Sequence, residues 1–155
     1  MKESSSMSNE KLLEKARQWF DVSFSDLRAA VAMRDAGIYN SACFMAQQAV
    51  EKAMKGTLIA TGIDPARTHS IELLSKQLGE GNESLSALSP ERLDRHYIAP
   101  RSPEALTEGS SISKSYKIED ADDAIRVAHG VVYLLGDWAE ELGVSIPLDN
   151  RRPTT

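Results

Sequence analysis

The chain has 155 residues, enough for one domain with a substantial hydrophobic core and too few for two. Its apolar share of 41% and charged share of 26% are ordinary for a globular protein, and no uncharged apolar run approaches the roughly 20 residues that a membrane span needs. The formal net charge of -5 argues against wrapping of long nucleic acid by bulk electrostatics, although a small anion or an RNA end could still meet local basic groups.

The N-terminal part predicts a polar start followed by a long helix. Residues 1–8 are rich in serine and lack the apolar core of a secretory signal, so we expect a disordered N-terminus and a cytoplasmic protein. From Asn9 onward apolar residues recur every three or four positions, as on one face of a helix. Gly37 suits a left-handed cap, so this first helix should end near Asp35.

Residues 38–61 predict the central helix of the fold. Small residues form one line along it: Ala42, Ala46, Ala49, Ala53, Gly56 and Ala60. So narrow a stripe lets a neighbouring helix approach closely, while the adjacent line of Cys43, Val50, Met54 and Leu58 fills the space beside it. The very short connection after the first helix makes the two helices antiparallel.

A polar row follows the other side of this central helix and consists of Gln48, Glu51, Lys52 and Lys55. Such a row is either a solvated face or the place of a function. Cys43 lies on the apolar line, so we interpret it as a buried structural thiol. One cysteine and three scattered histidines provide no metal-ligand spacing, and we expect neither a metal site nor a cofactor.

The second half of the chain predicts three further helical segments. Ser70 can cap a short helix over residues 71–78, with Leu73, Leu74 and Leu78 facing inward. Ser89 and Pro90 begin another short segment that reaches about residue 98. Residues 101–117 have no clear period and predict a functional or mobile loop. A long helix over residues 119–142 follows, and a loose tail is expected at residues 144–155.

Together these segments predict an all-α fold, an up-and-down helical bundle of about five helices. Two helices are long and antiparallel, two are short, and one long helix lies at the C-terminal end. We expect a single domain over residues 9–143. No stretch alternates in the way that a half-buried strand requires.

The order of these pieces resembles the HEPN family (higher eukaryotes and prokaryotes nucleotide-binding) over about residues 17–141. The resemblance rests on the run QQAVEKAMKG at residues 47–56 and on the Thr68, His69, Ser70 triplet. It is also carried by Trp19, Asp26, Leu27, Tyr39, Ala42, Phe44, Leu73, Leu74, residues 97–104, Tyr116, Asp120, Ala121 and Ala124. The resemblance implies a bundle that often dimerises, with a polar cleft near the dimer interface. Some members are RNA-cleaving toxins, and others are partners of a minimal nucleotidyltransferase or bind nucleotides.

The toxins of this family carry an arginine followed after four to six residues by a histidine, a pair suited to metal-free RNA cleavage. This sequence departs from that spacing, because Arg67 is too close to His69 and only three residues separate Arg92 from His96. Arg101 is followed by Ser102, where many relatives have an aromatic residue. The departure favours a non-catalytic role. Arg92 with His96 on one helix face, or His69 with Arg101, remains the alternative for a ribonuclease. Without such a role, we expect Arg95 and His96 to be surface residues of a short helix.

A nucleotide site needs donors for phosphate and a flat partner for the base. Our candidate site residues are Gln48, Lys52 and Lys55 as donors, His69 and Arg101 from neighbouring loops, and Tyr97 for stacking. His69 has a structural alternative, in which it bonds a carbonyl group or Gln48 and fixes the loop to the central helix. The chain lacks a GxxxxGK phosphate loop, which excludes that backbone cradle for triphosphate.

Three hypotheses follow from the sequence. The first is a non-catalytic HEPN module that acts as a homodimer and binds a nucleotide or a minimal nucleotidyltransferase partner. The second is a metal-free HEPN ribonuclease, the toxin of a toxin-antitoxin pair, for which RNA is the substrate. The third is a purely structural dimer that uses the small-residue stripe of the central helix as its interface.

Overall fold

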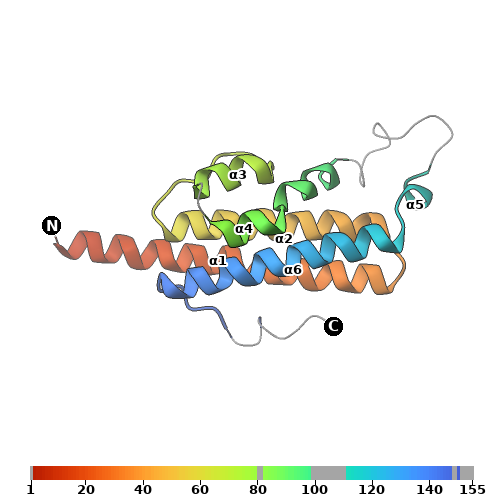
Figure 1. The fold of residues 1–155 in the computed structure, drawn as a ribbon. Coiled ribbons are helices and arrows are strands. Elements are labelled where there is room, and N and C mark those ends of the chain that lie inside the picture. The colour runs from red at the N-terminus through yellow and green to blue at the C-terminus, as the bar shows by residue number, and fades with distance from the viewer. Residues whose placement is uncertain (1, 80–81, 99–110, 148–149, 151–155) are drawn as a thin grey trace.

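The computed structural model describes residues 2–79, 82–98, 111–147 and 150, and within them the chain is helical, with no strand (Figure 1). The elements are α1 (Lys2–Asp35), α2 (Tyr39–Ala60), α3 (Ile71–Leu78), α4 (Glu83–Leu88), the 3-10 helix η1 (Pro90–His96), α5 (Ile112–Ser115) and α6 (Ile118–Glu141). The prediction of an all-α helical bundle is confirmed. Among the described residues, no helix has the length and apolar character that crossing a membrane requires.

The long helices α1, α2 and α6 lie side by side, and α3, α4 and η1 pack on one side of them (Figure 1). A short turn joins α1 to α2, and Gly37 adopts a φ of +80° there, which favours glycine over residues with a side chain. The two helices are therefore antiparallel, as the short connection predicted. The core lies where α2 is enclosed by α1 and α6.

The small-residue stripe of α2 is where this close packing occurs. Ala42, Ala46, Ala49, Ala53 and Gly56 are all buried. The Ser23 hydroxyl of α1 donates a 2.6 Å hydrogen bond to the main-chain oxygen of Ala49, which requires the two helices to lie close together. Because α1 and α6 already cover the stripe within one chain, it cannot be the interface between two copies. The hypothesis of a structural dimer built on this stripe is wrong.

Side-chain hydrogen bonds cap α3 and join it to η1. The hydroxyl of Ser70 caps α3 by accepting a hydrogen bond from the Leu73 amide, as predicted. The Asp94 carboxylate of η1 accepts hydrogen bonds from the Ile71 and Glu72 amides, at 2.6 Å and 3.1 Å. Both groups satisfy amides that have no partner within the helix. Asp94 thereby holds η1 against the start of α3.

Several boundaries differ from the sequence predictions. α1 begins at Lys2, although a disordered start and a helix from residue 9 were predicted. Leu73 is 49% exposed, and Ile71 occupies the core in its place. Val144 and Ile146 are buried, so the core continues beyond residue 143 into the predicted loose tail. In the predicted 101–117 loop, α5 occupies the part after residue 111, and residues 101–110 lie outside the described residues.

Candidate functional site

The polar row of α2 forms one connected cluster with side chains from three other parts of the chain. We define the α2 cluster as Asp26 and Trp19 of α1, Gln47, Gln48, Glu51, Lys52 and Lys55 of α2, His69 of the α2–α3 loop, and Tyr97, which follows η1. The side chains of α2 reach these neighbours because they recur every three or four residues on one face. The structure thus brings together five of the six predicted site residues. Arg101, the sixth, lies outside the described residues.

Two lysines of the α2 cluster are paired with carboxylates. The ammonium group of Lys52 bonds Asp26 across the α1–α2 contact, and the two side chains are only 21% and 11% exposed. The Nζ atom of Lys55 lies 3.4 Å from Glu51 Oε2 and 5.6 Å from the centre of the Trp19 ring. Neither lysine stands free in solvent, because both extend along the helix surface to a neighbour. Local charge within the cluster is consequently balanced.

His69 brings an exposed imidazole ring to the α2 cluster. Its Nδ1 lies 2.9 Å from Glu51 Oε1, and its side chain is 57% exposed while that of Glu51 is 4% exposed. The imidazole stacks on Tyr97 with 4.4 Å between ring centres and an angle of 15° between planes. One edge of the ring therefore faces a buried carboxylate, and one face covers an aromatic ring.

The loop that carries His69 is fixed to α2, as the structural alternative predicted, but through other partners. The amide nitrogen Nε2 of Gln47 donates to the main-chain oxygen of His69 at 2.9 Å. Gln48, the predicted partner, donates instead to Gln47 Oε1 at 2.7 Å. Gln47 is fully buried, so a pair of glutamines bridges the core of α2 and the loop.

Sequence reasoning did not select Asp26, Gln47, Glu51 or Trp19 as site residues. Glu51 was visible on the polar row, and its four-residue spacing to Lys55 indicated a helical ion pair. Asp26 and Trp19 carry no such local signal, since their partners lie on a different helix. Only the register between α1 and α2 brings them to the cluster.

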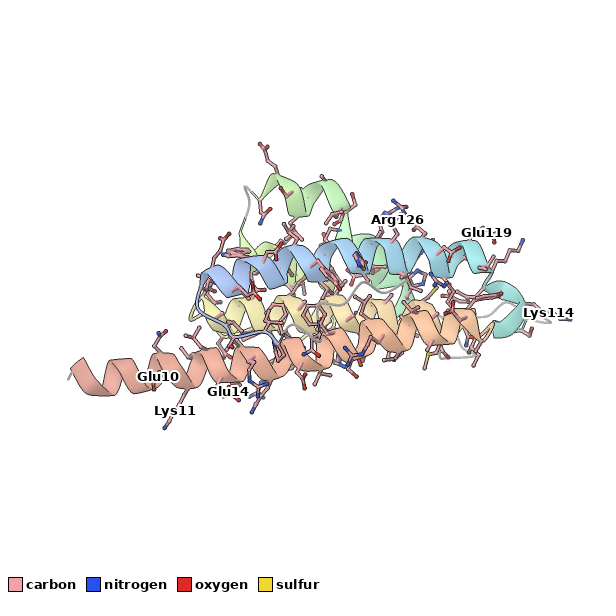
Figure 2. The ribbon with its side chains drawn as sticks, turned by 90° about the horizontal axis from the view of Figure 1, so that it is seen from below. Glu10, Lys11, Glu14, Lys114, Glu119 and Arg126 are labelled. Atoms are coloured by element: carbon pink, nitrogen blue, oxygen red, sulfur yellow. The ribbon has the colours of Figure 1, made fainter. Side chains whose placement is uncertain are left out.

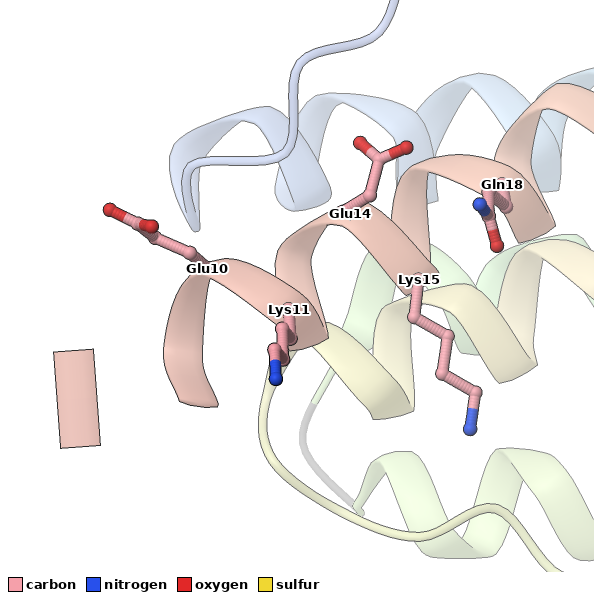
Figure 3. A pocket seen from close by; sticks show the side chains of 5 residues that line it. All are labelled: Glu10, Lys11, Glu14, Lys15 and Gln18. Atoms are coloured by element: carbon pink, nitrogen blue, oxygen red, sulfur yellow. The ribbon is translucent and has the colours of Figure 1, made fainter. Parts of the chain in front are cut away.

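A hollow of about 260 Å3 opens beside the cluster, lined by Gln18, Trp19, Val22 and Lys52. It combines an indole ring and an exposed aliphatic side chain with one ammonium group. A flat apolar group with a nearby negative charge suits such a lining. The larger hollow in Figure 3 is different, because its side chains Glu10, Lys11, Glu14, Lys15 and Gln18 all come from α1.

Arg92 and His96, the pair considered for RNA cleavage, do not form a site. His96 is 3% exposed, its Nδ1 lies 3.4 Å from the Tyr116 hydroxyl, and its Nε2 accepts a hydrogen bond from Arg95 at 3.3 Å. Burial and the neighbouring Arg95 guanidinium lower the pKa of His96 to about 4. Arg92 extends instead toward Asp123 of α6, at 3.6 Å. His96 is therefore a neutral core side chain, contrary to the expectation of a surface residue.

Cys43 is likewise a structural group. It is fully buried, and this burial raises the pKa of its thiol to about 12. A thiol in that state is not a nucleophile at neutral pH. The prediction of a buried structural cysteine is confirmed. In the part of the chain that the structure describes, no group of three or more histidine, cysteine, aspartate or glutamate side chains could hold a metal ion.

Charged side chains also line the outer side of α6, where Arg126 is labelled in Figure 2. Arg126 pairs with Asp123, and Arg34 lies 3.5 Å from Asp122. Hollows of about 320 Å3 and 360 Å3 adjoin Arg126. Arg92 and Arg126, which both line the smaller hollow, share Asp123 as their partner, so these ion pairs leave part of the positive charge beside that hollow unbalanced.

Comparisons with known proteins agree with the fold and with the resemblance in the sequence. The HEPN domain family model matches residues 16–138. A candidate toxin of Methanocaldococcus jannaschii, MJ1304, is 29% identical over 126 residues, covering 75% of this chain and 82% of that protein.

Two solved structures share the architecture. The protein TT1696 from Thermus thermophilus is 32% identical with a TM-score of 0.72, covering 79% of this chain and 97% of that one. ST0689, described as an archaeal HEPN homologue, is 31% identical with a TM-score of 0.67, covering 80% of this chain and 97% of that one.

Proposed function

Because the chain belongs to the HEPN domain family, we propose that it is a non-catalytic HEPN module that binds a nucleotide, either free or held by a minimal nucleotidyltransferase partner. The binding surface in this proposal is the α2 cluster. The protein acts as a homodimer, as the family resemblance implies, and light scattering should give about twice the mass of one chain.

The observation that carries the proposal is the stack of His69 on Tyr97 beside the buried Glu51. A buried carboxylate with its ion-pair partners often stabilises a fold no more than apolar side chains of the same volume would. A bundle has therefore little structural need for such a group on a face that is only partly covered. An exposed imidazole over an aromatic ring, in contrast, suits the recognition of a flat base.

The paired lysines are compatible with phosphate binding. An ammonium group carries three N–H donors, so Lys52 can share its donors between Asp26 and a phosphate oxygen. The hollow of Gln18, Trp19, Val22 and Lys52 begins at this same ammonium group. A phosphate there would lie next to a lysine without requiring the Lys52–Asp26 pair to break.

Calorimetry with ATP tests the proposal. Stacking of a base on the exposed His69 ring should contribute about 1–3 kcal/mol, so His69→Ala should weaken ATP binding by about tenfold or more. Lys76→Ala is the matched control, because this lysine is 66% exposed on α3 and pairs with Glu72 in a surface ion pair. Equal affinity of wild type and His69→Ala, with unchanged circular dichroism, removes His69 from the site.

The second candidate function is a ribonuclease toxin, favoured by the similarity to the candidate toxin MJ1304. Of the two arginine–histidine pairs considered for cleavage, the burial of His96 leaves His69 with Arg101. Incubating the purified protein with single-stranded RNA should then yield cleavage that His69→Ala abolishes. No cleavage at high protein concentration eliminates this candidate and leaves the binding module.

A further inference from the structure

The contact between Glu51 and His69 fixes which ring nitrogen of His69 carries the proton. A carboxylate can only accept hydrogen bonds, and Glu51 faces the Lys55 ammonium group as a carboxylate, so the Nδ1 atom of His69 must be the donor at 2.9 Å. A neutral imidazole has one N–H group. The other nitrogen, Nε2, then keeps its lone pair and is a hydrogen-bond acceptor.

Three contacts hold the His69 ring in this orientation. Glu51, which is 3% exposed, takes the Nδ1 edge, Tyr97 covers one face, and Gln47 holds the main-chain oxygen. The His69 side chain is nevertheless 57% exposed. An exposed ring that is held on one edge and one face has little rotational freedom left to lose when it binds something.

We propose that Glu51 is a positioning residue, which accepts the Nδ1 proton of His69 in a hydrogen bond and thereby presents Nε2 as an acceptor for a ribose hydroxyl group of the bound nucleotide. This inference rests on the proposed function. A phosphate of ATP is an acceptor at neutral pH and cannot donate to Nε2, whereas a ribose hydroxyl can. Phosphate and sugar are thus recognised by different members of the α2 cluster, Lys52 and His69.

The tautomer of His69 can be measured without any ligand. Nitrogen-15 NMR at about pH 8.5, where imidazole side chains are ordinarily neutral, separates the two tautomers through the shifts of the ring nitrogens. We expect the Nδ1–H form for His69 in the wild type. In Glu51→Ala the carboxylate is gone, and the Nε2–H form should become dominant.

The other histidines serve as internal controls. His96 receives a hydrogen bond on Nε2 from Arg95 and is buried, so its signals should be the same in wild type and Glu51→Ala if the fold is retained. His129 stacks on Tyr133 of α6, away from Glu51 in the sequence, and should not change either. A dominant Nε2–H form of His69 in the wild type overturns the positioning role. Where Glu51→Ala fails to fold, the tautomer of the wild type alone decides it.

The ligand half of the proposal is tested by comparing ATP with 2',3'-dideoxyATP, which differs only in the ribose hydroxyls. One hydrogen bond lost should weaken binding to the wild type by roughly three- to tenfold. His69→Ala, which has no ring nitrogen to meet the hydroxyl, should bind both nucleotides equally well. Equal affinity of the wild type for the two overturns the hydroxyl contact. If ATP does not bind at all, both the proposed nucleotide binding and the hydroxyl contact are wrong. The NMR result still decides whether Glu51 positions His69.

Discussion

Lys52 and Asp26 form a largely buried ion pair of the α2 cluster. The Asp26 side chain is only 11% exposed, and its carboxylate loses its cation if Lys52 becomes methionine. An unpaired buried charged group costs about 1–3 kcal/mol or more, so we expect Lys52→Met to lower the free energy of unfolding by about that amount. Urea unfolding followed by circular dichroism measures the change.

Lys76→Met is the matched control for Lys52→Met. Lys76 and Glu72 form an ion pair whose side chains are 66% and 62% exposed, and exposed pairs of this kind contribute about 0–1 kcal/mol. The control should therefore change the stability much less. If both substitutions have the same small effect, the Lys52–Asp26 pair does not contribute as its burial indicates.

His96 makes stability depend on pH. The folded pKa is about 4, below the ordinary value of about 6.5 for an unfolded chain, so the unfolded state binds the proton more readily. The contribution of neutral His96 is complete above about pH 6.5 and is lost as the pH falls toward about 4. Between about pH 7 and 4.5 the wild type should lose about 2 kcal/mol through this group.

His96→Gln isolates that contribution, because glutamine can accept from Arg95 and donate to Tyr116 but does not titrate in this range. Urea unfolding measures the free energy of unfolding at about pH 7 and about pH 4.5. Between these two pH values the variant should lose about 2 kcal/mol less than the wild type. Identical losses for wild type and variant would show that folding does not lower the pKa of His96.

The site residues were predictable to the extent that they share one helix face. Gln48, Lys52 and Lys55 follow from the period of α2, and His69 follows from its place beside the Ser70 cap. Their partners depend on tertiary packing, which a single sequence does not encode locally. That is why Asp26 was not selected, and why His96 was expected on the surface although it is enclosed beneath Tyr116.

At the scale of elements, the close approach of α1 and α2 depends on Gly56. A Cβ atom there would lie 3.0 Å from two ring atoms of Phe20 and 3.2 Å from Trp19 Cβ. Phe20 is fully buried and its ring has little room to move. We expect Gly56→Ala to lower stability by about 1–3 kcal/mol, despite the gain of about 1 kcal/mol from alanine in a helix.

Gly130 of α6 is the control for this substitution. Its added Cβ would meet the Leu88 side chain, at 3.1 Å from a terminal methyl carbon that can shift. Gly130→Ala should accordingly be neutral or stabilising by thermal unfolding. A similar loss of stability for both substitutions would contradict this. It would mean that the close approach of α1 and α2 is no more sensitive to an added methyl group than the contact of α6 with α4.

The long helices were predictable because each carries an apolar stripe over many turns. α4 was not, since it spans six residues of which only Leu85 is buried, too few for a period to be visible. The same limit affected α3, where Ile71 takes the core position predicted for Leu73, because two helical turns do not define which face points inward. The position of a short helix depends on its neighbours, as the hydrogen bond from the Ile71 amide to Asp94 shows for α3.

For the whole molecule, family and fold agree on a helical bundle in which α2 has two distinct sides. One side of α2 carries the small residues that α1 and α6 enclose, and another carries the α2 cluster. Rigid packing on the first side holds the second in a fixed geometry, which lowers the entropy cost of binding. In the proposed function, the first side of α2 serves packing and the second side serves recognition.

The most direct test of this account is to map the ATP-binding surface by amide and side-chain chemical shifts in NMR. The account predicts that the largest changes lie at Gln48, Lys52, His69 and Tyr97 and leave Arg126 on α6 unchanged. Changes that gather around Arg126, or no changes at saturating ATP, would contradict it.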